Sequence, residues 1–178
     1  MRPWNTLSRT TILDHSKWLK VEDHTIQLPD GKIIEQWPWI ISPDYVNVVV
    51  ENEDGDFVCF RQTKYAADGI TFAPVGGYLY SGEQPLMCAK RELREELGYE
   101  AREWIHLGTF PCDGNHGNGY AHLFLARGAH KTVEIIAADL EEQEIISLTR
   151  NEMMQALLNG EFKVLSWSTA VALSLFHV

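Results

Sequence analysis

Residues Gly77–Tyr99 read GYLYSGEQPLMCAKRELREELGY, and the rest of the chain is best interpreted outward from this stretch. It predicts a helix from Pro85 to Leu97, because proline suits the first position of a helix and apolar residues recur on one face, at Leu86, Ala89, Leu93 and Leu97. Gly98 follows at the place where a left-handed cap ends a helix. The stretch therefore predicts a loop that leads into one amphipathic helix.

Three carboxylates lie close together on this helix. Glu92, Glu95 and Glu96 fall within an arc of about 100° around its axis. Like charges four residues apart repel each other, so the crowding is unfavourable unless cations compensate it. Mg²⁺ and Mn²⁺ prefer such hard oxygen ligands. Taken alone, the pattern also fits a solvated acidic face with Arg91 and Arg94 as ion-pair partners.

The spacing upstream of these glutamates favours the metal interpretation. Gly77 is followed after five residues by Glu83 and, after seven more, by Arg91-Glu92-Leu93-Arg94-Glu95-Glu96-Leu97-Gly98-Tyr99. This pattern resembles the signature of the Nudix hydrolases, in which an aliphatic residue usually stands at the position of Tyr99. Seven specified residues, each with an average usage of about 5–7%, match at a given start by chance on the order of once in 10⁸ to 10⁹.

The resemblance implies a catalytic site with bound Mg²⁺ or Mn²⁺. The implied ligands are the three helix glutamates and the backbone carbonyl of Gly76, and the implied catalytic set is Glu83, Arg91, Glu92, Glu95 and Glu96. Glu83 and Arg91 are implied to brace the loop against the helix through a charge-assisted contact. Gly77 and Gly82 fit a loop that turns sharply and lets its backbone approach the ion.

More loosely, nearly the whole chain resembles the ADP-ribose and sugar-nucleotide pyrophosphatase branch of that family. The segment 28–31 resembles the amino-terminal hairpin of that branch, 60–65 resembles its Arg-Gln-x-Arg segment, and 160–170 resembles its last helices. The resemblance implies a small nucleotide substrate, with Arg61 and Lys64 near its phosphate or ribose oxygens. Both residues also fit exposed charges at the end of a strand.

Two further expectations concern the amino-terminal strands. Trp37 and Trp39 would share one face of a strand and could stack on a nucleobase, although a core or dimer contact fits them equally well. The resemblance also implies a homodimer, because the amino-terminal hairpins of this branch often build one.

The chain departs from the branch at two places. Pro74-Val75-Gly76-Gly77 has one residue more than the usual Pro-x-Gly, which could shift the carbonyl ligand, and the segment 111–119 lacks a glutamate that ADP-ribose enzymes commonly carry. Strict ADP-ribose specificity is therefore not expected. The branch takes its general base from a glutamate in a later loop, and Glu142 and Glu144 are the candidates here, with a solvated acidic loop as the alternative.

The remaining pattern predicts an α+β fold with a mixed β-sheet between helices and an antiparallel β extension at the amino terminus. Strands are expected at 20–28, 32–39, 45–51, 57–60, 104–110 and 121–126, and further helices at 150–158 and 166–176. Pro29-Asp30-Gly31 and Asp54-Gly55 predict tight turns between the first two pairs of strands. We expect a single domain over residues 1–178, with the extension at 1–40, the core at 41–178 and the signature at 77–99.

Composition excludes several other classes of protein. The chain has 178 residues, 45% of them hydrophobic, and a formal net charge of −10, which argues against disorder and against a protein that coats nucleic acid. Three cysteines without Cys-x-x-Cys spacing favour reduced thiols and a cytoplasmic location. The amino terminus lacks the apolar run of a signal peptide, and the apolar stretch 165–178 is too short to span a membrane.

These observations converge on one activity. We expect metal-dependent hydrolysis of the pyrophosphate bond of a nucleoside diphosphate linked to another group, most plausibly ADP-ribose or a nucleotide sugar. One alternative is a nucleoside triphosphate pyrophosphohydrolase. Another is a Nudix domain that senses a nucleotide without hydrolysing it, although such a domain would usually have lost glutamates of the signature.

Overall fold

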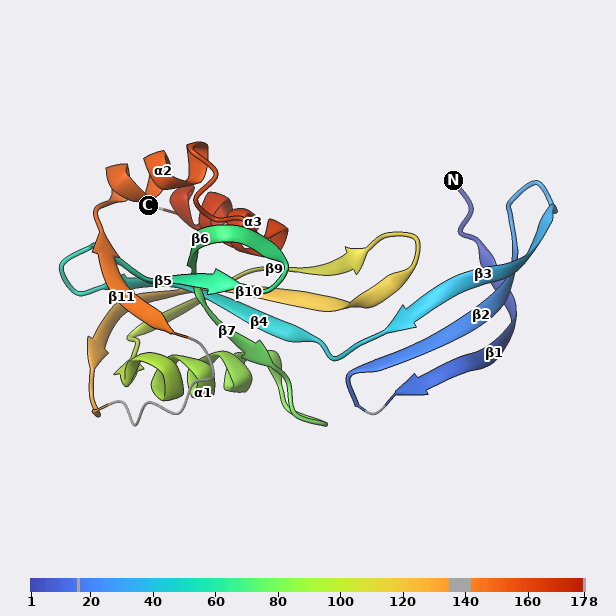
Figure 1. The fold of residues 1–178 in the computed structure, drawn as a ribbon, viewed down its shortest axis with the longest axis horizontal. Helices are drawn as coiled ribbons and strands as arrows, with labels where there is room; N and C mark the ends of the chain where they lie inside the picture. Colours follow the sequence, from blue (N-terminus) through green and yellow to red (C-terminus); the bar gives the residue numbers. More distant parts are fainter. Residues whose placement is uncertain (16, 135–141, 178) are drawn as a thin grey trace. The chain divides into compact units, whose positions relative to one another are not determined.

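The computed structural model describes residues 1–15, 17–134 and 142–177, and its helices and strands are drawn in Figure 1. The backbone divides into two compact units. The first consists of Met1–Asp44 and Phe110–Tyr120, and the second of Tyr45–Thr109 and Ala121–Val178. Each unit is described by itself.

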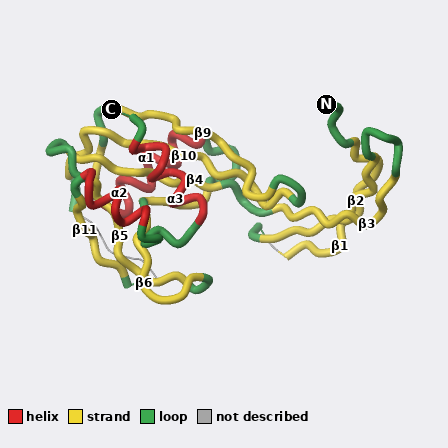
Figure 2. Tube along the Cα trace, turned by 90° about the horizontal axis from the view of Figure 1, so that it is seen from above, coloured by secondary structure: helices red, strands yellow, loops and turns green. Residues whose placement is uncertain are grey.

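The first unit is an antiparallel sheet of three strands, β1 (Asn5–His15), β2 (Leu19–Gln27) and β3 (Ile33–Ile41). The turn between β2 and β3 lies at Asp30-Gly31, where Gly31 has a φ of 90° that favours glycine. The turn between β9 (Glu103–Asp113) and β10 (Gly117–Lys131) also belongs to this unit, and Gly117 of β10 pairs with Ile40 of β3. Figure 2 shows strands and loops in this unit, whereas the helices belong to the second.

The second unit is built around β4 (Tyr45–Asn52), whose valines are almost completely buried. β4 runs parallel to β10 (Gly117–Lys131) and antiparallel to β5 (Phe57–Lys64) and β7 (Val75–Tyr78). β5 in turn pairs antiparallel with β6 (Ala67–Ala73) and β11 (Gln143–Leu148). The short β8 (Tyr99–Glu100) and β9 (Glu103–Asp113) both pair with β10. The result is a mixed sheet.

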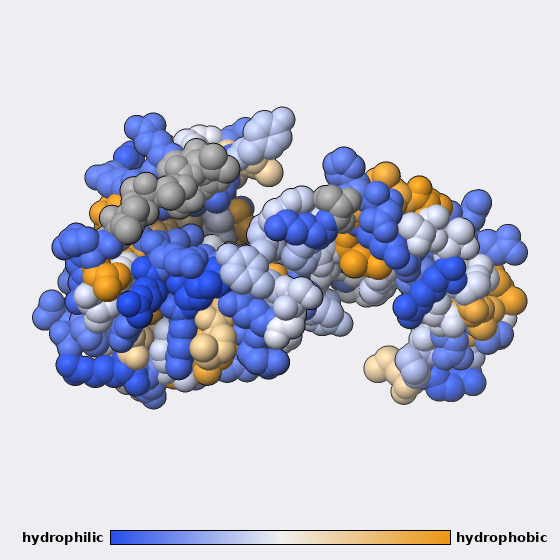
Figure 3. All heavy atoms as spheres, turned by 90° about the horizontal axis from the view of Figure 1, so that it is seen from below, coloured by the Kyte–Doolittle hydropathy of each residue, from blue (hydrophilic) through white to orange (hydrophobic). Residues whose placement is uncertain are grey.

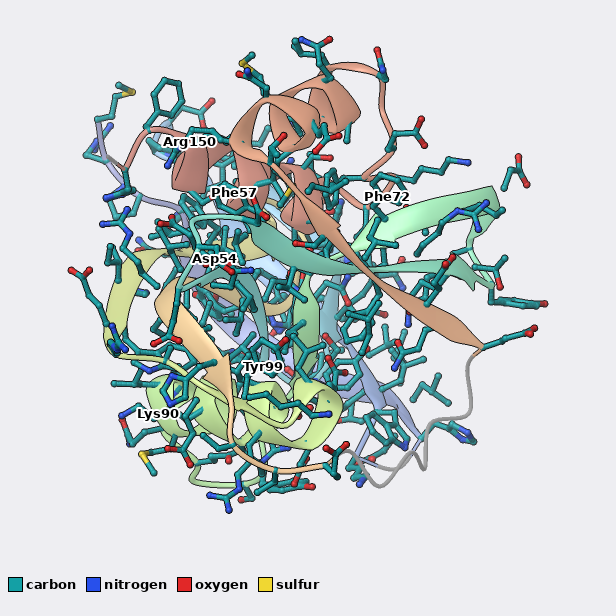
Figure 4. All side chains as sticks on the ribbon, turned by 90° about the vertical axis from the view of Figure 1, so that its left-hand side faces the viewer. Asp54, Phe57, Phe72, Lys90, Tyr99 and Arg150 are labelled. Carbon is teal, nitrogen blue, oxygen red and sulfur yellow. The ribbon has the colours of Figure 1, made fainter. Side chains whose placement is uncertain are left out.

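Helices cover both faces of this sheet. α1 (Pro85–Leu97) lies against one face, and α2 (Arg150–Leu158) and α3 (Leu165–Leu175) lie against the other, as Figures 1 and 4 show. α1 buries Cys88, Ala89, Leu93 and Leu97 against the strands. α3 packs on β4 from the opposite side through Trp167, Ala170 and Val171. The predicted α+β class, with its mixed sheet between helices and its antiparallel extension, is confirmed.

The expected helices and strands are present. The structure differs from the prediction in having additional strands and in one position of the buried face of α1. The helices predicted at 85–97 and 150–158 have these bounds, and the third helix begins and ends one residue earlier than predicted. β1, β6, β7, β8 and β11 were not expected. Every residue of β1 is exposed, so its sequence carries no alternation between apolar and polar residues. Leu86 was expected on the buried face of α1, but its side chain is exposed. The side chain of Cys88, which was not expected on that face, is buried.

The surface of the first unit carries many exposed hydrophobic side chains. They belong to β1, the loop after β1 and β3, and they include Leu7, Ile12, Leu13, Trp18, Ile33 and Ile41. Figure 3 shows the same tendency as orange patches over this unit. A helix covers neither face of the sheet among the described residues of this unit. Its apolar side chains are consequently left on the surface.

Candidate active site

The position of the site depends on how α1 is held in the fold. Its core face sets the rotation of the helix, and Pro85 at its start and Gly98 at its end set the length. Gly98 has a left-handed φ of 70°, and a Cβ there would overlap the backbone carbonyl of Val133. Glu92 and Glu96 then flank the core face on the side of β7.

Arg91 is the centre of the site. Its guanidinium forms a bidentate contact with Glu83, in which Nε and Nη2 donate to the two carboxylate oxygens, both at 3.0 Å. Nη1 donates to Glu92 Oε1 at 2.6 Å and to Glu95 Oε2 at 3.1 Å. Nη2 also donates to the backbone carbonyl of Tyr78 at 3.2 Å. One arginine therefore holds together β7, two of the three helix glutamates and the loop 79–84 between β7 and α1, which we call the entry loop.

The entry loop is braced at Tyr80, which the sequence did not single out. The Tyr80 backbone N–H donates to Glu83 Oε2 at 3.0 Å, and its ring lies 4.2 Å from the carbon at the centre of the Arg91 guanidinium. Such a cation–π contact adds to the ion pairs and covers one face of the guanidinium. The available signal was an aromatic residue three positions before Glu83, which is weak without the conformation of the loop.

Two glycines before this loop lie where a side chain would not fit. A Cβ on Gly77 would overlap the carboxylate of Glu92, and a Cβ on Gly76 would lie 2.8 Å from the carbonyl oxygen of Val46. The Gly76 N–H donates to Glu96 Oε2 at 3.3 Å, so Gly76 and Glu96 are neighbours. Gly82 lies in open space, and its φ of 79° is what favours glycine there.

The pKa values of two carboxyl groups in the cluster shift in opposite directions. The hydrogen bonds from Arg91 hold the pKa of Glu83 at about 2, below its usual value of 4.5. Burial raises the pKa of Glu92, although Arg91 opposes this effect. The same contacts, that with Glu83 foremost, raise the pKa of Arg91. Arg91 and Glu83 therefore stay charged, and a nearby cation would offset the effect of burial on Glu92.

The family follows from a match that contains this whole cluster. The model of the NUDIX domain matches residues 42–167. The chain belongs to this family. It is a Nudix hydrolase, and members of the family generally use divalent metal ions. A second model, described as the nucleoside diphosphate sugar hydrolase N-terminal domain, matches residues 4–40.

Individual relatives of this Nudix hydrolase include enzymes of nucleotide metabolism. An ADP-ribose pyrophosphatase of Bacillus subtilis is 27% identical over 146 residues, which are 82% of this chain and 74% of the relative. A methanol dehydrogenase activator of Bacillus methanolicus is 28% identical over 149 residues, or 84% and 79% of the two chains. The crystal structure of an ADP compounds hydrolase superposes with a TM-score of 0.80 and 17% identity and covers 98% of this chain and 93% of its own, which shows the same fold. The hydrolase is thus related to ADP-ribose pyrophosphatases.

The cluster offers donors suited to a hard divalent cation. Glu92, Glu95 and Glu96 supply only carboxylate oxygens, and the missing Cβ of Gly77 leaves room for the buried carboxylate of Glu92. In this structure Arg91 and the Gly76 N–H hold these carboxylates. Within residues 1–15, 17–134 and 142–177, no three acidic, histidine or cysteine side chains already converge as a complete metal site. The chemistry of the donors fits the ion, and their side chains would have to turn toward it.

Two other predicted residues form a separate pair. β5 and β11 align Arg61 with Glu144, and Arg61 Nη1 donates to Glu144 Oε2 at 3.3 Å. Both side chains are exposed. Lys64 ends β5, and Glu142 is exposed just before β11. A predicted substrate residue and a predicted base are therefore brought together, although 83 residues separate them in the chain.

The predicted tryptophans lie on β3 in the first unit. Trp37 stacks on His116 with ring centroids 5.1 Å apart, and its Nε1 donates to the backbone carbonyl of Asn115 at 2.9 Å. Trp39 stacks on His24 with centroids 5.4 Å apart. One face of each indole is therefore in contact with a histidine of its own unit, and stacking on a nucleobase stays a prediction for the other face.

Proposed function

We propose that this Nudix hydrolase cleaves the pyrophosphate bond of a nucleoside diphosphate linked to another group, with ADP-ribose or a nucleotide sugar as the favoured substrate. The products are a nucleoside monophosphate and a second phosphorylated compound. The observation that carries the proposal is the Arg91 cluster, in which one guanidinium holds Glu83, Glu92 and Glu95. Gly76 and Gly77 lie next to this cluster. The cluster concentrates carboxylates where a phosphate-bridging cation can bind.

The residues that would hold the ion are Glu92, Glu95, Glu96 and the backbone carbonyl of Gly76, and Mg²⁺ or Mn²⁺ is the proposed ion. When bound, it would neutralise phosphate oxygens and lower the pKa of a coordinated water. Arg91 and Glu83 act as positioning residues, because they hold the loop and α1 in register. Gly77 keeps the space that the Glu92 carboxylate occupies.

Glu144 and Glu142 are the proposed general bases. Glu144 lies on β11, and its carboxylate contacts the exposed guanidinium of Arg61. Glu142 is one residue before β11 and is exposed to solvent. A base must reach the attacking water while substrate is bound, and both side chains are accessible enough to do so.

The substrate class is supported by the amino-terminal residues. Residues 4–40 match an N-terminal domain named for nucleoside diphosphate sugar hydrolases, and the relative from Bacillus subtilis is named for ADP-ribose. Arg61 and Lys64 add positive charge on β5, where they are proposed to contact phosphate or ribose oxygens. Trp37 and Trp39 are proposed to contribute aromatic surface for the base.

We also propose that the protein is a homodimer through its first unit. The exposed apolar side chains of β1, the loop after it and β3 support this proposal, because large exposed apolar patches mark interaction sites. β1 also ends its sheet and presents an open edge for pairing. The division into a β extension at 1–40 and a core at 41–178 is proposed to separate this dimer contact from the chemistry at α1.

A cytoplasmic location is proposed from the cysteines. Cys59, Cys88 and Cys112 form no disulfide with one another, and burial raises the pKa of both Cys59 and Cys88 to about 12. Reduced thiols are typical of that compartment. No helix in the described part of the chain has the length and hydrophobicity needed to cross a membrane.

The proposed function is tested with a panel of substrates. The purified protein is incubated with Mg²⁺ and, in separate reactions, with ADP-ribose, NADH, nucleotide sugars, diadenosine polyphosphates and nucleoside triphosphates, and the products are identified by mass. Release of a nucleoside monophosphate from ADP-ribose or a nucleotide sugar is expected. Release of pyrophosphate from triphosphates alone would favour the triphosphate pyrophosphohydrolase. Absence of turnover of every compound with Mg²⁺ and with Mn²⁺ would favour the nucleotide-sensing alternative.

A further inference from the structure

A pocket of about 370 Å³ lies beside the outer surface of α1, and no role has so far been assigned to it. α1 contributes Lys90, Arg91 and Arg94 to its lining, and the segment that follows the helix contributes Tyr99, Glu100 and Trp104. Figure 4 labels Lys90 on this helix and Tyr99 close to it. All these residues belong to the second unit. The pocket is therefore formed within one compact part of the chain.

The lining of the pocket is positive in a protein whose net charge is −10. Lys90 and Arg94 are four residues apart on α1, so their side chains are neighbours and repel each other. Arg94 Nη1 donates to Glu100 Oε1 at 3.2 Å, but both of these side chains are exposed and such a pair contributes little to stability. Lys90 is exposed and forms no ion pair with any residue that the structure describes. An anion that bridges the two cations would remove their repulsion.

The pocket also offers aromatic surface next to these cations. Tyr99 and Trp104 line it from β8 and β9, and both are partly exposed. The Trp104 ring contacts Phe124 edge to face, with centroids 6.4 Å apart, and this contact holds the indole in place. Ligand pockets usually have volumes of about 300–1,000 Å³, so this one suits a small ligand. Cations beside aromatic rings suit a phosphate attached to a planar base.

The pocket is separate from the carboxylates of the candidate active site. Successive residues of a helix are about 100° apart around its axis, so Glu92 lies about 200° from Lys90 and Glu96 lies about 200° from Arg94. The two sites are thus on opposite flanks of α1. Arg91 lies between them: it lines the pocket, and its Nη1 donates to Glu92 and Glu95.

We propose that this pocket is a second nucleotide site, which binds a nucleoside monophosphate with its phosphate on Lys90 and Arg94 and its base against Tyr99 and Trp104. The choice of ligand rests on the proposed function, whose product is a nucleoside monophosphate, but the binding itself requires no turnover. A phosphate in the pocket competes with Glu92 and Glu95 for Arg91. Binding of the monophosphate consequently weakens the hydrogen bonds by which Arg91 holds Glu92 and Glu95. In this way the product regulates the enzyme.

Binding is measured by isothermal titration calorimetry of AMP into the full-length protein, in EDTA and without divalent metal. The double variant Lys90→Gln/Arg94→Gln is expected to bind AMP at least about tenfold more weakly than the wild type. Tyr99→Ser, which removes a ring and no charge, is expected to weaken binding as well. Arg102→Gln/Lys131→Gln changes the net charge by the same amount at two exposed residues outside the pocket, and its affinity is expected to equal that of the wild type.

Three results would overturn the proposal. They are unchanged AMP affinity in Lys90→Gln/Arg94→Gln, an equal loss in Arg102→Gln/Lys131→Gln, and binding of inorganic phosphate as tight as that of AMP. If the panel above identifies a substrate, AMP is also expected to inhibit turnover with a component that excess substrate does not relieve and that the pocket variant lacks. Failure of the panel leaves the calorimetric test intact, so the two proposals fail separately.

Discussion

Replacing Arg91 with methionine tests the role of the cluster most sharply. Methionine keeps the aliphatic stem of the side chain and removes the charge with all of its hydrogen bonds. Glu83 and Glu92 then lose their shared partner, although their side chains are only 14% and 12% exposed. Charges left unpaired in such a place are costly because little water reaches them.

The expected destabilisation is about 3 kcal/mol. Breaking a buried ion pair by removing one partner costs about 3–5 kcal/mol, and the lower end applies because these carboxylates keep some contact with solvent. In a chain of this length 1 kcal/mol corresponds to about 2–4 °C, so the melting temperature should fall by about 6–12 °C. Arg94→Met serves as the control, because Arg94 pairs with Glu100 on the surface and its loss should cost at most about 1 kcal/mol.

The difference between wild type and Arg91→Met should also depend on pH. The pKa of Glu83 is about 2 in the folded protein and about 4.5 when unperturbed. The stability that this shift contributes is therefore fully present above pH 4.5 and is lost as the pH falls toward 2. Arg91→Met lacks the cause of the shift, so the gap between the two unfolding free energies should narrow over this interval.

Urea unfolding followed by circular dichroism, in EDTA at pH 7 and at steps from pH 5 to pH 3, measures these quantities. A difference of less than about 1 kcal/mol at pH 7, or one as small as that of Arg94→Met, would refute the structural role of Arg91. If the difference in unfolding free energy between wild type and Arg91→Met stays constant down to pH 3, Arg91 is not the cause of the lowered pKa of Glu83.

Three further predictions concern Gly77, the proposed homodimer and the general base. Gly77→Ala should preserve the circular dichroism spectrum but lower turnover at least about tenfold, because its Cβ displaces the Glu92 carboxylate; turnover equal to that of wild type would contradict this steric argument. Ile12→Glu should convert a dimer to a monomer in sedimentation velocity, whereas Ile70→Glu, also exposed but in the second unit, should not, and a monomeric wild type would exclude the proposed interface. Of Glu142→Gln and Glu144→Gln, one should lower kcat by about 10²-fold or more in steady-state kinetics, and two fully active variants would place the base elsewhere.

Local sequence was sufficient where the determining contacts are local. α1 could be predicted with its bounds because Pro85 and Gly98 mark its ends. The contact of Arg91 with Glu95 follows from helix spacing, and the contact with Glu83 was implied by the resemblance. The contact with Glu92 does not follow from spacing, because neighbouring residues do not face each other on a helix. β7 was missed because two of its four residues are glycine, which carries no pattern of burial.

Contacts between distant segments could not be predicted in this way. Arg61 and Glu144 meet only because β11 pairs with β5 in one particular register. The segment 111–119 lies in the first unit, where the ring of His116 stacks on Trp37, and nothing in its own sequence predicts this contact. The pocket beside α1 depends on the path of the chain after Gly98, and residue spacing on the helix does not define that path.

The most direct test of the central claim is the rate of nucleoside monophosphate release from the best substrate of the panel, measured across a titration with Mg²⁺. The wild type should be inactive in EDTA and active once Mg²⁺ is restored. Glu96→Gln, which stays folded, should be slower by at least about 100-fold, because loss of a ligand should cost at least as much as loss of its supporting contacts. Glu103→Gln, an exposed carboxylate on β9, should match the wild type. Full activity of Glu96→Gln, or wild-type turnover without any divalent metal, would contradict a metal-dependent site on α1.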